Sequence, residues 1–110
     1  MKRTLFECNA NDVKMEINAM FEGGELVIEG RDASPHVAAW WGDEEQEYTL
    51  LLPEESVAEL RHVLNLNPFA RKDLLETLAI RFGDMNCFAD LRRFLIRWAI
   101  PYKDNLRMRA

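Results

Sequence analysis

The chain has 110 residues, of which 48 % are apolar and 30 % are charged. This composition is typical of a globular domain, and it excludes a disordered chain, a collagen-like repeat and a membrane protein. One domain spanning residues 1–110 is expected, since no linker, repeat or low-complexity stretch interrupts the sequence. The net charge of −5 divides unevenly. Residues 1–60 hold 4 basic and 14 acidic groups, a net −10, whereas residues 61–110 hold 10 basic and 5 acidic groups, a net +5.

The N-terminus and the cysteines together predict a cytoplasmic protein. Lys2 and Arg3 are followed by no apolar stretch, and Glu7 interrupts the segment early, so no signal peptide is expected. No window approaches the roughly 20 apolar residues that a membrane span needs. Cys8 and Cys87 are far apart in the sequence, and without a secretion signal they are expected to be free thiols.

The first half of the chain predicts an antiparallel meander. Residues 4–9 are short and β-like, and residues 13–21 alternate between apolar and mostly polar side chains, as a strand with one buried face does. Residues 22–24, Glu-Gly-Gly, predict a hairpin turn into a strand at residues 25–31. A fourth strand is expected at residues 48–52, after an acidic run.

A short helix or turn is expected between the third and fourth strands. Ser34 and Pro35 have the character of an N-cap and a first helical residue, and Gly42 is a suitable residue to end such a segment. The segment contains the adjacent pair Trp40 and Trp41. Adjacent helical residues point about 100° apart, so we expect one indole to be buried and the other to lie at the surface.

The second half of the chain predicts three helices. Pro53 opens the first, and Asn67 with Pro68 opens the second, which runs to about Phe82 and stops at Gly83. The third helix has a cap at Asp84 or Asn86 and ends before Pro101. Its apolar stripe consists of Phe88, Leu91, Leu95 and Trp98.

The order of elements, strands first and helices later, predicts an α+β fold. We expect an antiparallel sheet of about four strands, a meander, with about three C-terminal helices packed on one face. The basic tail, residues 102–110, either adds a strand or frays.

No motif for a metal, a nucleotide or a catalytic nucleophile stands out, so neither a cofactor nor a catalytic residue is predicted. One alternative is a small enzyme or ligand-binding protein that uses His36 with Asp32 or with a cysteine, Cys8 or Cys87. Because no basic residue flanks either cysteine, unreactive thiols are the preferred interpretation.

A second alternative is a nucleic-acid-associated regulator that uses the basic C-terminal half. Arg92, Arg93 and Arg97 lie off the apolar stripe of the last helix, and the tail adds Lys103, Arg107 and Arg109. The net negative charge and the absence of interleaved aromatic residues favour arginines that are solvated or paired with the acidic half.

The acidic run next to the tryptophan pair is the preferred candidate for binding. Tryptophan is enriched at interface hot spots, and a dense run of carboxylates is tolerated best when a basic partner meets it. The predicted partner-binding residues are Trp40, Trp41, Asp43, Glu44, Glu45 and Glu47.

Two blocks of the sequence resemble a known group of proteins. The first block is Glu29-Gly30-Arg31-Asp32, Val37, Trp41-Gly42-Asp43 and Glu47-Tyr48, and the second is Leu74-Leu75, Arg81-Phe82, Phe88, Phe94-Leu95 and Ile100-Pro101-Tyr102. Together they resemble small uncharacterised bacterial proteins that are similar to immunity-type proteins of toxin–immunity loci. The resemblance covers roughly residues 25–102 and implies a protein-binding role without a catalytic set.

The sequence therefore predicts a non-catalytic, acidic protein-binding module, a monomer or homodimer that does not bind a membrane. The sharper hypothesis is an immunity or inhibitor protein that sequesters a basic toxin or enzyme, because complementary charge speeds association and excludes wrong partners.

Overall fold

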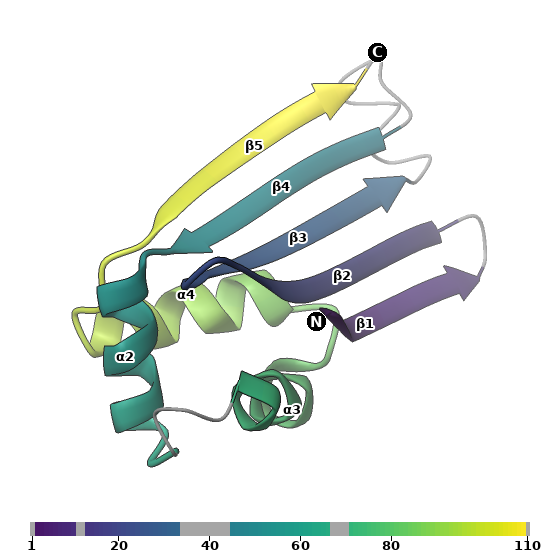
Figure 1. Cartoon of the computed structure of the whole chain (residues 1–110). Coiled ribbons are helices and arrows are strands. Elements are labelled where there is room, and N and C mark those ends of the chain that lie inside the picture. The colour runs from purple at the N-terminus through teal and green to yellow at the C-terminus, as the bar shows by residue number, and fades with distance from the viewer. Residues whose placement is uncertain (1, 11–12, 34–44, 67–70, 110) are drawn as a thin grey trace.

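The chain folds as an antiparallel sheet with helices packed against one of its faces (Figure 1). The structure is a computed structural model, and it describes residues 2–10, 13–33, 45–66 and 71–109. The elements in the described residues are β1 (Lys2–Ala10), β2 (Val13–Glu22), β3 (Glu25–Ala33), β4 (Glu45–Leu52), α2 (Glu54–Val63), α3 (Arg71–Phe82), α4 (Cys87–Arg97) and β5 (Lys103–Arg109). This arrangement confirms the predicted α+β fold. The described sheet has five strands where about four were expected, because the basic tail forms β5.

The sheet places the basic tail beside the acidic β4. Strand order is β1-β2-β3-β4-β5, and every neighbouring pair is antiparallel. Three helices separate β4 from β5 along the sequence, yet β5 returns to pair with β4 (Figure 1). In that register Glu47 is opposite Arg107 and Glu45 is opposite Arg109. The charge separation between the two halves of the sequence is therefore reduced by the fold.

The hydrophobic core lies between the sheet and the helices. Ile17 and Ala19 in β2 and Leu26 and Ile28 in β3 are buried, as the alternation in the sequence predicted. The core residues that the helices contribute are Val57 and Leu60 from α2, Leu74, Leu75, Leu78 and Phe82 from α3, and Cys87, Phe88, Leu91 and Leu95 from α4. Burial of this apolar surface holds the helices on the sheet.

The end of α4 differs from the prediction for Trp98. The helix stops at Arg97, and Ala99 adopts a left-handed conformation with φ +55°. The amide of Ile100 then donates to the carbonyl of Leu95, 2.9 Å away, which is the hydrogen bond of a Schellman motif. Ile100 is buried, whereas Trp98 is 51 % exposed. The expectation that Trp98 belongs to the buried stripe was wrong, because the chain reverses one residue after it.

Gly83 follows α3 for a reason other than the predicted one. Its φ is not positive, so it is not a left-handed end of the helix. A Cβ at this position would lie 2.8 Å from the carbonyl oxygen of Leu5 and would also strike the carbonyl oxygen of Ala79. Glycine is therefore needed because the last turn of α3 and the backbone of β1 both lie too close for a side chain.

Two predicted features fall on residues outside the described part of the chain: the short helix at residues 34–41 and the helix start at Asn67 and Pro68. In the described part, no helix is long and apolar enough to cross a membrane.

Candidate protein-binding surface

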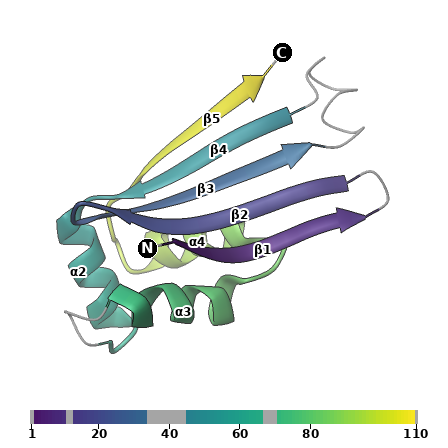
Figure 2. The same ribbon diagram turned by 45° about the vertical axis from the view of Figure 1, so that its right-hand side comes forward.

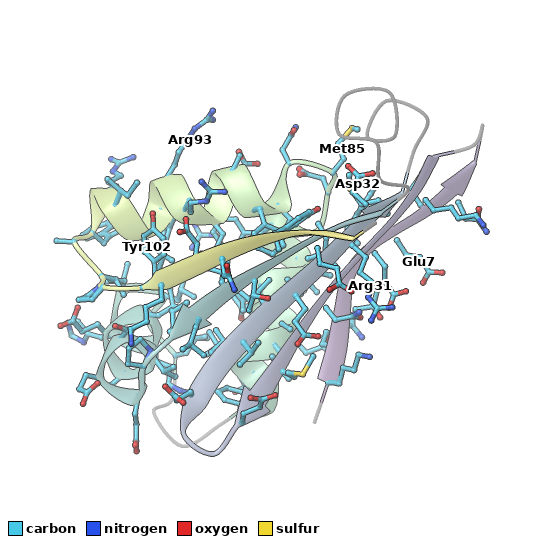
Figure 3. The ribbon with its side chains drawn as sticks, turned by 90° about the horizontal axis from the view of Figure 1, so that it is seen from above. Glu7, Arg31, Asp32, Met85, Arg93 and Tyr102 are labelled. Carbon is cyan, nitrogen blue, oxygen red and sulfur yellow. The ribbon has the colours of Figure 1, made fainter. Side chains whose placement is uncertain are left out.

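One face of the sheet is covered by α2, α3 and α4, and no described helix lies on the other (Figure 2). Side chains alternate between the two faces along each strand. In Figure 3, Glu7 and Arg31 lie on the side of the sheet away from α4, whereas Arg93 and Met85 lie on the helical side. We call the uncovered side the open face; its described positions include Thr4, Glu7, Glu16, Asn18, Met20, Val27, Glu29, Arg31, Glu47, Thr49 and Leu51.

A row of charged residues crosses four strands of the open face. Glu7 is the register partner of Glu16, Glu16 of Arg31, and Arg31 of Glu47. The Nε atom of Arg31 lies 3.4 Å from Oε1 of Glu47. Glu7 and Glu16 are thus like charges directly opposite each other, an arrangement that destabilises an antiparallel pair.

A neighbouring row of polar residues positions one carboxylate of the charged row, that of Glu16, through hydrogen bonds. The hydroxyl of Thr4 donates to Oδ1 of Asn18 at 2.9 Å, and Nδ2 of Asn18 donates to Oε1 of Glu16 at 2.6 Å. Asn18 is only 8 % exposed, so this short chain of hydrogen bonds holds the Glu16 carboxylate in one place. Glu29 is the register partner of Asn18 on the next strand.

Two shallow hollows lie along this part of the sheet. One, of about 350 Å³, is lined by Glu7, Cys8, Asn9, Lys14, Met15, Glu16 and Arg31. The other, of about 500 Å³, lies over β3, β4 and the start of β5 and is lined by Glu22, Val27, Glu29, Gly30, Arg31, Glu47, Tyr48, Thr49, Leu51, Lys103, Asp104 and Asn105. Carboxylates and the basic residues Lys14, Arg31 and Lys103 therefore line the two hollows together, with the half-buried Leu51 in the second.

Of the predicted partner-binding residues, Glu47 lies on this surface. Its side chain is 21 % exposed and contacts Arg31. Glu45 is the first residue of β4, and Trp40, Trp41, Asp43 and Glu44 lie outside the described residues. Sequence reasoning missed Glu7, Glu16 and Glu29. The alternation of β1, β2 and β3 places these carboxylates on the polar side, and that pattern was the available signal.

The alternative with a catalytic His36 gains no support from the described residues. His36 lies outside them, and Asp32 lies on the helical side of β3, where its charge acts on Tyr48. Burial raises the pKa of Tyr48 to about 12, and the charges of Asp32 and Cys87 add to the effect. Burial also raises the pKa of Cys87 to about 12, with Asp84 and Asp90 adding to it. At neutral pH this thiol is protonated, which is the opposite of an activated nucleophile.

The cysteines of the described residues form no disulfide. Both cysteines are free, as predicted; Cys87 is buried and Cys8 is half-buried. No group of three or more His, Cys, Asp or Glu side chains in this part of the chain is placed to hold a metal ion.

The arginines of the nucleic-acid alternative have acidic neighbours. The Nε atom of Arg92 lies 3.7 Å from Oδ2 of Asp104, and Nη1 of Arg93 lies 3.7 Å from Oδ1 of Asp90. Both acidic partners belong to residues 61–110, so these two arginines pair within their own half of the chain and not with the acidic half. Both pairs are largely exposed, so each contributes little to stability.

Comparisons with known proteins give no further guide to function. No family model, no curated protein and no solved structure matches the chain.

Proposed function

We propose that the chain is a non-catalytic protein-binding module, and that its open face accepts the basic surface of another protein. The finer form of the proposal is an immunity or inhibitor protein that sequesters a basic toxin or enzyme in the cytoplasm. The observation that carries it is the pair Glu7 and Glu16, two carboxylates held opposite each other on an uncovered face.

The pair of Glu7 and Glu16 costs free energy in the unbound protein. Like charges directly opposite on neighbouring strands destabilise the sheet, and Asn18 holds Glu16 in this position. A lysine or arginine from a partner would remove the repulsion on binding. Glu29 adds an exposed carboxylate on β3, and the half-buried Leu51 offers apolar contact beside it.

The proposal is tested by comparing charge reversals on two sides of the molecule. The full-length chain, purified and tagged, is used to capture proteins from an extract of its native cell. We expect a basic protein that is retained at low salt and released at high salt. Glu7→Lys and Glu29→Lys should each abolish the capture, whereas the matched reversal Glu59→Lys, at an exposed position of α2, should not.

A stability measurement separates lost binding from lost folding. Glu7→Lys converts the like-charge pair with Glu16 into an opposite-charge pair, so the free energy of unfolding should rise by about 0.2–1 kcal/mol. Loss of capture together with a gain in stability supports the open face as the binding surface. Equal capture by the Glu7→Lys and Glu59→Lys variants, or capture of no basic protein, contradicts the proposal.

A further inference from the structure

The helical side of the molecule carries a surface that is rich in arginine and aromatic side chains. Phe94 and Trp98 lie one helical turn apart, with ring centroids separated by 6.3 Å. The guanidinium carbon of Arg81, on α3, lies 5.2 Å from the centroid of the Phe94 ring. Arg93 and Arg97 also lie one turn apart on α4, and this row runs beside the row of Phe94 and Trp98. We call these five residues the arginine–aromatic surface.

The arginine–aromatic surface is solvent-accessible and partly apolar. Trp98 is 51 % exposed. Ile96 is also exposed on α4, but it is two residues from both Phe94 and Trp98 and therefore lies on another side of the helix. In the described part of the chain, the large apolar side chains that are exposed are Ile80, Met85, Ile96 and Trp98, and all of them belong to α3, α4 or the residues that flank these helices.

The exposure of Trp98 follows from the way the helix ends. The left-handed Ala99 turns the chain so that Ile100 enters the core, and the amide of Trp98 donates to the carbonyl of Phe94 at 3.1 Å. Trp98 is thereby held at the helix end against Phe94, while Phe94 contacts Phe82 with centroids 5.6 Å apart. The indole is an anchored, exposed side chain, as hot-spot residues of interfaces are.

We propose that the arginine–aromatic surface binds an acidic, amphipathic segment of a partner protein. Aromatic residues, methionine and arginine are the types enriched in protein interfaces. Arg81, Arg93 and Arg97 lie around the rings and select carboxylates, as the 3.7 Å contact of Arg93 with Asp90 illustrates. The exposed indole of Trp98 offers contact to an apolar side chain of such a segment, and the net charge of −5 opposes the dense phosphate charge of a nucleic acid more than the few carboxylates of a peptide.

This surface is separate from the open face of the sheet. Figure 3 shows Arg93 on the side of α4 that points away from the sheet, whereas Glu7 lies beyond the sheet on the other side. The two surfaces lie on opposite sides of the sheet. The proposed acidic partner of this surface can therefore be tested independently of the basic partner proposed for the open face.

The test uses the full-length chain and a synthetic acidic amphipathic peptide composed of Glu, Asp, Leu and Phe. Binding is followed by the NMR signal of the Trp98 indole N–H, assigned with Trp98→Phe. We expect this signal to shift on titration, and we expect Arg97→Glu to weaken binding by about tenfold. Arg92→Glu is the matched control, because Arg92 lies on the opposite flank of α4 beside Asp104. Glu7→Lys should leave this binding unchanged.

Three results would overturn the proposal. The first is an equal effect of Arg97→Glu and Arg92→Glu on the affinity for the peptide. The second is tighter binding of a single-stranded oligothymidine than of the acidic peptide, since the surface would then be a nucleic-acid site. The third is self-association of the free chain, measured by sedimentation and abolished by Trp98→Ala. The surface would then bind a second copy of the chain.

Discussion

The ring of Phe88 meets the ring of Tyr48 edge to face, with centroids 4.2 Å apart and an interplanar angle of 88°, against the backbone of Gly30. The contact joins α4 to the neighbouring strands β3 and β4. A Cβ at residue 30 would lie 2.8 Å from Cε2 of Phe88 and would strike Cε2 of Tyr48. The absence of a side chain at Gly30 is therefore what allows the aromatic pair to lie on the sheet.

Gly30→Ala is expected to destabilise the fold by about 1–3 kcal/mol, the usual penalty for overpacking a core. Urea unfolding followed by circular dichroism measures the change. The same substitution in a Tyr48→Leu background should lose less stability, because the ring that collides with the new methyl group is gone. Equal losses in the two backgrounds would contradict this account of Gly30.

The free energy of unfolding is expected to decrease at alkaline pH because of Tyr48 and Cys87. Each has a pKa of about 12 in the folded protein, against ordinary values of 10.0 for tyrosine and 9.0 for cysteine. Between about pH 9 and pH 12 the unfolded chain loses these protons while the folded chain keeps them. The unfolded state then binds fewer protons, so the free energy of unfolding decreases as pH rises through this window.

Urea unfolding at a series of pH values checks the direction and the window. In Cys87→Ala only Tyr48 contributes, and the decrease should begin nearer pH 10 than pH 9. An unchanged pH profile in that variant would show that the thiol does not contribute.

The two thiols are expected to differ in reactivity. Cys8 is half-buried, whereas Cys87 is buried and has a raised pKa. A thiol reagent at neutral pH should therefore modify Cys8 first and reach Cys87 only when the protein unfolds. Mass spectrometry after brief labelling identifies the modified residue, and Cys8→Ser gives the control in which native labelling should nearly vanish. Rapid labelling of Cys87 in the folded Cys8→Ser variant would contradict its burial.

The sequence predicted those features that depend on local pattern. The alternation in residues 13–21 predicts β2, because the side-chain period of a strand depends only on its backbone. The strand β5 could not be decided, because it exists through pairing with β4, across three intervening helices. Trp98 was misplaced because the end of α4 depends on a left-handed alanine, a conformation that alanine rarely adopts.

The residues of the open face could also be predicted only where a local pattern marks them. Glu47 was predicted from the acidic run, which is visible along the chain. The pairing of Glu7 with Glu16 depends on the register of β1 against β2, and this register shifts at an irregularity between Thr4 and Phe6. Spacing along a single strand therefore does not reveal which carboxylates meet across strands.

Ala99 offers a direct way to raise the stability of the protein. It occupies the left-handed position after α4 with φ +55°, where glycine has no steric penalty. Ala99→Gly should increase the free energy of unfolding by about 0.5–1 kcal/mol, because relief of the left-handed strain exceeds the added flexibility of the unfolded chain. Ala99→Val should decrease it, since a branched side chain fits this conformation worse.

Asn65 provides the matched control, because α2 ends in the same way. It has φ +58°, and the amide of Leu66 donates to the carbonyl of Arg61 at 2.8 Å. Asparagine tolerates this conformation better than alanine, so Asn65→Gly should stabilise the protein less than Ala99→Gly does. Thermal and urea unfolding of the variants give the comparison. A loss of stability in Ala99→Gly would show that the left-handed end of α4 is not strained.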